Sequence, residues 1–144
     1  MQRPKMQFAD NEELGRYLRE WQERLFLNDW IIDAKLVDEL YSEEKNIVLG
    51  RNDFCLISRV SNISISRYNP VRDNSPRSLK KYCAEQILVH ELLHLVYNFM
   101  TLDYSNYIAA TFDTLEHQQL DKLADSFIMA KYNLSYDYFI NKKD

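Results

Sequence analysis

The motif His90-Glu91-Leu92-Leu93-His94 is the part of the sequence best suited to chemistry. It lies in a helical pattern, and residues four apart on a helix share one face, about 5–6 Å from each other. The imidazoles of His90 and His94 can therefore bind one metal ion, while the carboxylate of Glu91 reaches a metal-bound water as general base. Neutral imidazole suits Zn²⁺, so the motif predicts one zinc ion per chain. The alternative is a pair of core histidines that bind nothing, which would bury polar groups at a cost.

A catalytic zinc site needs a third protein ligand, and the next helical segment offers three candidates. That helix is expected to begin near Asp113. Glu116 is the first choice as ligand because its face continues through apolar residues and should look into the core; these residues are Leu120, Leu123 and Phe127. His117 and then Asp121 are the alternatives, and those not used could orient a ligating imidazole. Asp113 and Glu116 also have capping-box spacing, so Glu116 could merely bind a backbone N–H.

The segments 90–94 and 115–120 together resemble the zincin metallopeptidases, which carry HExxH on their active-site helix. Within the zincins they are most similar to the gluzincin branch, and to the small single-domain minigluzincin-like metallopeptidases of phages and bacterial mobile elements. The resemblance implies His90, His94 and Glu116 as ligands, with Glu91 as base. It also implies a twisted sheet whose edge strand aligns an extended peptide. The candidate edge strand is 62–68, with the residues Asn62, Ile63, Ser64, Ile65 and Ser66.

Two features of the families do not carry over to this chain. Residues 96–100 contain neither the third histidine nor the glycine of the metzincin extension. The His or Tyr with which larger gluzincins stabilise the oxyanion has no clear counterpart. Tyr97, Tyr104 and Tyr107 are candidates, but in a chain with ten tyrosines ordinary core or surface aromatics are the simpler interpretation.

The elements that must position the motif can be read from periodicity. Asp10 is the expected N-cap of a first helix, whose apolar stripe is Leu14, Tyr17, Leu18, Trp21 and Leu25. Strand-like segments follow at 30–37, 46–49, 54–60 and 62–68, with a turn-like Arg51-Asn52-Asp53 between the second and third. Two helical segments complete the chain. The order predicts an α+β fold in which a small, twisted, mainly antiparallel sheet packs on the active-site helix and a following C-terminal helix.

Composition bounds the class of protein. A chain of 144 residues without repeats or linkers predicts a single domain over residues 1–144. A net charge of −4 argues against a nucleic-acid partner, and no apolar stretch is long enough for a membrane span. Two cysteines are too few for a disulfide framework, and no signal peptide is visible. We therefore expect a cytoplasmic protein, of an oligomeric state that the sequence does not specify.

Three functions fit these observations. The leading hypothesis is a zinc-dependent endopeptidase acting on a peptide or protein. The alternative is a catalytically silent zinc-binding module, in which the ligands only hold two helices together. A third is a regulator that cleaves or binds one specific protein, such as a repressor, in phage or mobile-element biology. An open fourth coordination position favours the enzyme, and a fourth protein ligand favours the module.

Overall fold

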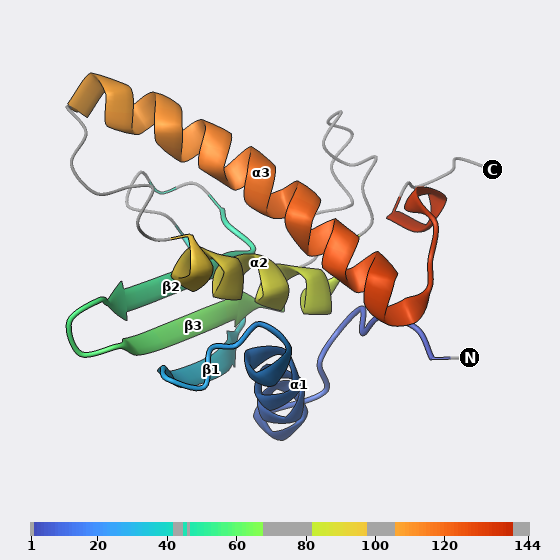
Figure 1. Ribbon diagram of the computed structural model, residues 1–144. Coiled ribbons are helices and arrows are strands. Elements are labelled where there is room, and N and C mark those ends of the chain that lie inside the picture. Colours follow the sequence, from blue (N-terminus) through green and yellow to red (C-terminus); the bar gives the residue numbers. More distant parts are fainter. Residues whose placement is uncertain (1, 42–44, 46, 68–81, 98–105, 140–144) are drawn as a thin grey trace.

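The computed structural model describes residues 2–41, 45, 47–67, 82–97 and 106–139, and for residues 106–114 and 136 the backbone alone. It confirms an α+β fold with an N-terminal helix, a three-stranded sheet and two packed C-terminal helices (Figure 1). In chain order the elements are α1 (Asn11–Arg24), β1 (Ile31–Val37), β2 (Gly50–Cys55), β3 (Val60–Ser66), α2 (Ala84–Val96), α3 (Asn106–Tyr132) and a short 3₁₀ helix, η4 (Tyr136–Phe139). None of the described helices is both long and apolar enough to cross a bilayer.

The sheet has the strand order β1-β3-β2. β3 is parallel to β1 and antiparallel to β2, so the sheet is mixed rather than mainly antiparallel. β3 pairs on both sides, and the expectation that Asn62, Ile63, Ser64, Ile65 and Ser66 form an edge strand is wrong. The alternation that identified the strand is correct, since Ile63 and Ile65 are buried. Alternation reports which face is buried and is the same for a central strand and an edge strand, so it could not decide the position.

The prediction of a turn at Arg51-Asn52-Asp53 is wrong, because these residues belong to strand β2. These three polar residues lie in the strand and pair with β3, and the actual turn follows Cys55 and ends at Arg59, which has a φ of 53°. Polar residues are tolerated here because β2 lies at one edge of the three-stranded sheet, where its side chains are only partly covered.

Helix α2 lies between the sheet and α3, while α1 lies against β1 (Figure 1). Nearly every residue of α2 is buried, which explains why its apolar residues run all round the helix. On the sheet, Ile63 and Ile65 of β3 share one face with Asn52 and Gly50, their partners in β2, and this face looks toward the helices. The metal-binding motif is therefore on the most enclosed helix of the fold.

Helix α1 begins as its sequence predicts. The side chain of Asp10 accepts a hydrogen bond of 2.8 Å from the backbone N–H of Glu13. The carboxylate of Glu13 in turn accepts one of 3.0 Å from the N–H of Ala9, one residue before the cap. The predicted stripe faces the core, with Leu14, Leu18 and Trp21 buried.

Helix α3 begins at Asn106 rather than near Asp113. Asp113 therefore lies inside the helix, and Glu116 is not the third residue of a capping box there. The spacing of an acidic pair is a weak start signal because the same spacing recurs inside helices. The helix packs on α2 through a stripe at intervals of four residues, Leu120, Ala124 and Ile128, all buried.

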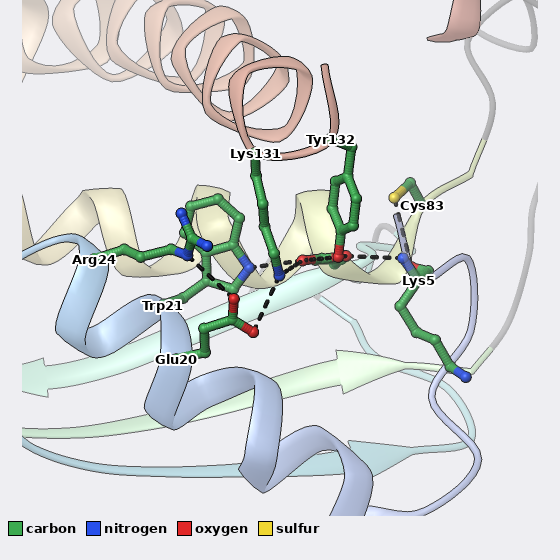
Figure 2. A network of polar contacts seen from close by, with 8 residues as sticks. Lys5, Glu20, Trp21, Arg24, Cys83, Lys131 and Tyr132 are labelled. Carbon is green, nitrogen blue, oxygen red and sulfur yellow. Dashed lines mark hydrogen bonds and ion pairs between the residues drawn. The ribbon is translucent and has the colours of Figure 1, made fainter. Parts of the chain in front are cut away.

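A buried carboxylate, Glu85 of α2, joins the three helices away from the histidines. Its side chain is fully buried and accepts hydrogen bonds of 2.8 Å from Nε1 of Trp21 and 2.7 Å from the hydroxyl of Tyr132. It also binds Nζ of Lys131 at 2.8 Å and the backbone N–H of Lys5 at 2.8 Å. Lys131 reaches down from α3 to Glu20 and the ring of Trp21 in α1, and Tyr132 lies beside it with its hydroxyl on Glu85 (Figure 2). The network fixes α3 against α1 and α2.

Candidate metal centre

Three imidazoles converge between α2 and α3. His90 and His94 come from α2 and His117 from α3, and one ligand atom of each lies within 4.8 Å of the other two. Nε2 of His90 is 3.2 Å from Nδ1 of His117. Two nitrogens bound to one tetrahedral Zn²⁺ at 2.0–2.1 Å lie about 3.3–3.4 Å apart, so this separation fits a shared ion. Within the described part of the chain, this is the one group of three metal-ligating side chains at such distances.

Two carboxylates from α3 lie beside the imidazoles of α2, and that of Asp121 is within hydrogen-bond distance of His90. Oδ1 of Asp121 lies 2.8 Å from Nδ1 of His90, and Oε1 of Glu116 lies 3.6 Å from Nδ1 of His94. Nε2 of His90, the atom that faces His117, is then left for a metal. A carboxylate behind a ligating imidazole fixes its tautomer and raises its basicity, which is typical of protein zinc sites. Nε2 of Gln86 also donates to Asp121, at 3.4 Å.

The protonation state of His94 favours metal binding. Burial, together with the charges of the nearby His90 and His117, lowers the pKa of His94 from 6.5 to about 3. His94 is therefore neutral at physiological pH in the absence of an ion. Neutral imidazole is the form that coordinates, so the site does not have to release a proton from His94 when a metal binds.

The structure brings together most, but not all, of the predicted ligands. His90 and His94 share the group as the motif predicts, and the third member is the alternative candidate, His117. Glu116 is buried, as its apolar face predicts, but it is not in the group and lies beside His94. Its role as the ligand stays a prediction. Asp121 occupies the orienting position that was expected of an unused neighbour.

Glu91, the predicted general base, is enclosed between α2 and β2. Glu91 is 6% exposed, and its burial is the main reason why the pKa of its carboxyl is raised to about 7. Among the smaller influences, the charge of His90 lowers this pKa, while the charges of Asp121 and Asp53 raise it. Its backbone carbonyl accepts a hydrogen bond of 2.8 Å from Nδ2 of Asn52. A carboxylate with a pKa near neutrality can both accept and return a proton at working pH.

Of the three candidate oxyanion residues, Tyr97 is the one whose side chain the structure describes. Tyr97 follows α2, is half-buried and packs against the core. Tyr104 and the side chain of Tyr107 lie outside the described residues.

No family model matches the chain, and neither a curated protein nor a solved structure does. The resemblance to zincins therefore rests on the motif. What the geometry adds is a candidate three-histidine metal site, held by two helices and flanked by carboxylates.

The sequence interpretation missed two residues that contact Glu91. Gly50 and Asn52 were assigned to a strand end and a turn, yet both lie in β2 beside the motif helix. A signal was present, since Gly50 is one of only two glycines in the chain and adjoins a run of β-forming residues.

Proposed function

We propose that the protein is a zinc-dependent hydrolase of peptide bonds, with His90, His94 and His117 as ligands and Glu91 as general base. The observation that carries the proposal is the convergence of three imidazoles from two helices, next to a buried carboxylate in the HExxH spacing. Three histidines leave one of the four positions of a tetrahedral ion for water or substrate, as catalytic zinc sites require.

The donor set fits zinc in chemistry as well as in distance. A zinc ion held here would lower the pKa of water and polarise the substrate carbonyl. Glu91 accepts the proton of the attacking water while the new C–O bond forms. It then delivers that proton to the leaving amine nitrogen as the C–N bond breaks, and it is ready for the next cycle. Asp121 keeps the imidazole of His90 in place, and the carboxylate of Glu116 lies beside that of His94.

Metal content tests the ligand set. We expect about one zinc ion per purified wild-type chain by inductively coupled plasma mass spectrometry. His117→Ala should lose the ion, while Glu116→Gln should keep it with lower affinity. Gln118→Ala, an exposed neighbour on α3, is the control and should bind as the wild type does. Loss with Glu116→Gln and retention with His117→Ala would make Glu116 the third ligand. No zinc in the wild type after reconstitution would refute the site.

Hydrolysis tests the reaction. Zinc-loaded wild type should cleave a mixture of unstructured peptides, followed by mass spectrometry, because no residue here identifies the sequence that is cleaved. Glu91→Gln should abolish cleavage and keep the zinc, since the amide cannot accept a proton. Equal cleavage by wild type and Glu91→Gln would refute Glu91 as base.

A silent zinc module is the second candidate, and the bridging of two helices favours it. An ion at this site would tie α2 to α3, and the buried Glu116, whose carboxylate lies 3.6 Å from Nδ1 of His94, is the candidate for a fourth ligand if its side chain turns toward the ion. In that case both His117→Ala and Glu116→Gln would lose zinc. The zinc-loaded wild type would then show a raised melting temperature without cleaving any peptide.

A further inference from the structure

The atoms that surround position 50 require a glycine there, whereas the backbone conformation does not. The φ of Gly50 is not positive, so a side chain would be compatible with the local conformation. A Cβ atom at this position, however, would lie 2.8 Å from Oε1 and 3.1 Å from Cγ of Glu91, and 2.7 Å from Cγ2 of Ile87. Glycine within a strand weakens the strand, and it is typical of sites that another group approaches closely. Here the approaching group is the carboxylate of Glu91.

Asn52, two residues along the same strand, holds the backbone of Glu91. Its Nδ2 donates to the carbonyl oxygen of Glu91 at 2.8 Å, across 39 positions of sequence. The orientation of the amide is fixed from the other side, because the hydroxyl of Ser61 donates to Oδ1 of Asn52 at 2.6 Å. Ser61 is fully buried in β3. The chain of contacts runs from the central strand through β2 to the motif helix.

We infer that Gly50 and Asn52 are positioning residues for Glu91. Gly50 leaves the room in which the carboxylate lies, and Asn52 fixes the helix backbone that carries it. The inference rests on the role proposed above for Glu91, and it assigns to β2 a part in setting the direction of that carboxylate. Both residues meet the motif helix at Glu91, so we expect each to act through the base rather than through the metal ligands.

Gly50→Ala is the primary test, and Gly15→Ala is its matched control. The same methyl group at Gly15 of α1 would meet only Nη1 of Arg19, at an ordinary 3.5 Å. In Gly50→Ala the end of the Glu91 side chain is the part that can move, so the carboxylate is displaced. We expect unchanged zinc content and affinity but cleavage slower by about a hundredfold, because a displacement of about 1 Å costs roughly that factor. Gly15→Ala should leave both unchanged. Equal cleavage by the two variants would overturn the inference.

A second measurement does not depend on hydrolysis. The fall in melting temperature caused by Gly50→Ala is measured in the wild type and in a Glu91→Ala background, both free of metal. We expect a smaller fall in the second background, since one of the two clashing side chains has gone. An equal fall would mean that Ile87 alone meets the methyl group, and would refute the contact. If the wild type cleaves nothing, the proposed function fails while this cycle still decides the positioning.

Asn52→Asp tests the other residue at nearly constant size. It replaces the donor by an oxygen that repels the carbonyl of Glu91. We expect normal zinc content with slow cleavage and a lower melting temperature, whereas Asn28→Asp, at an exposed position, should change none of these. If Asn52→Asp melts at the same temperature as Asn28→Asp, the proposed role of the hydrogen bond is refuted, whatever the cleavage assay gives.

Discussion

Lys131→Met should destabilise the fold more than any surface substitution, because it leaves Glu85 charged without a cation. Nζ of Lys131 lies 2.8 Å from Glu85 and 3.2 Å from Glu20, and the side chain is only 7% exposed. The ammonium also lies 4.8–5.2 Å from the ring centres of three aromatic residues, Tyr17, Trp21 and Tyr132. The neutral donors of Trp21 and Tyr132 stay with the carboxylate, but they do not balance its charge. Removal of one partner from a buried ion pair costs about 3–5 kcal/mol of the free energy of unfolding.

The assay is urea denaturation of metal-free protein, followed by circular dichroism at pH 7. For a chain of this length, the expected cost corresponds to a fall in melting temperature of about 10–17 °C. Lys122→Met is the control, because Lys122 is exposed on the same helix, and it should change the free energy of unfolding by less than about 0.5 kcal/mol. In a Glu85→Gln background, Lys131→Met should cost clearly less than in the wild type. A cost below about 1 kcal/mol in the wild type would refute the reasoning.

Three further predictions concern the helix start, a buried phenol and the metal centre. Asp10→Ala should lower the free energy of unfolding by about 1 kcal/mol through loss of the N-cap; an unchanged denaturation midpoint would contradict this. Burial raises the pKa of Tyr82 from 10.0 to about 12, and its hydroxyl donates to the carbonyl of Ser66. The unfolded chain therefore releases this proton first, and stability should fall as the pH rises from 10 toward 12. The fall should be smaller in Tyr82→Phe, as measured by denaturation at several pH values; identical pH profiles would count against it. Asp121→Asn should weaken zinc binding by about 10–100-fold through loss of the orienting carboxylate on His90, measured by chelator competition, and unchanged affinity would show that the contact is dispensable.

Local patterns in the sequence predicted local features correctly. Asp10 caps α1 because a cap depends on residues three positions apart, and the stripe of α1 is buried because a helix repeats every 3.6 residues. His90 and His94 share a face for the same reason. The order of helices and strands also sufficed for the α+β class.

Features that depend on long-range pairing were predicted poorly. The alternating segment 62–68 was expected at the edge of the sheet, but it forms the central strand β3. The polar residues 51–53 were expected to form a turn, but they lie within strand β2. Gly50 and Asn52 meet Glu91 about 40 positions away in sequence, and no periodicity within β2 indicates that contact.

The sequence by itself determined that two imidazoles and a carboxylate share one helix, because spacing on a helix is fixed by its backbone hydrogen bonds. Only the tertiary structure decided which residue of the second helix joins them. Glu116 and His117 are adjacent, and one residue on a helix is a rotation of about 100°. That rotation is set by the packing of α3 on α2 through buried apolar side chains and by the Glu85–Lys131 contact. It places an imidazole in the group and the neighbouring carboxylate beside His94, because the contact surface of the two helices fixes both their angle and their register.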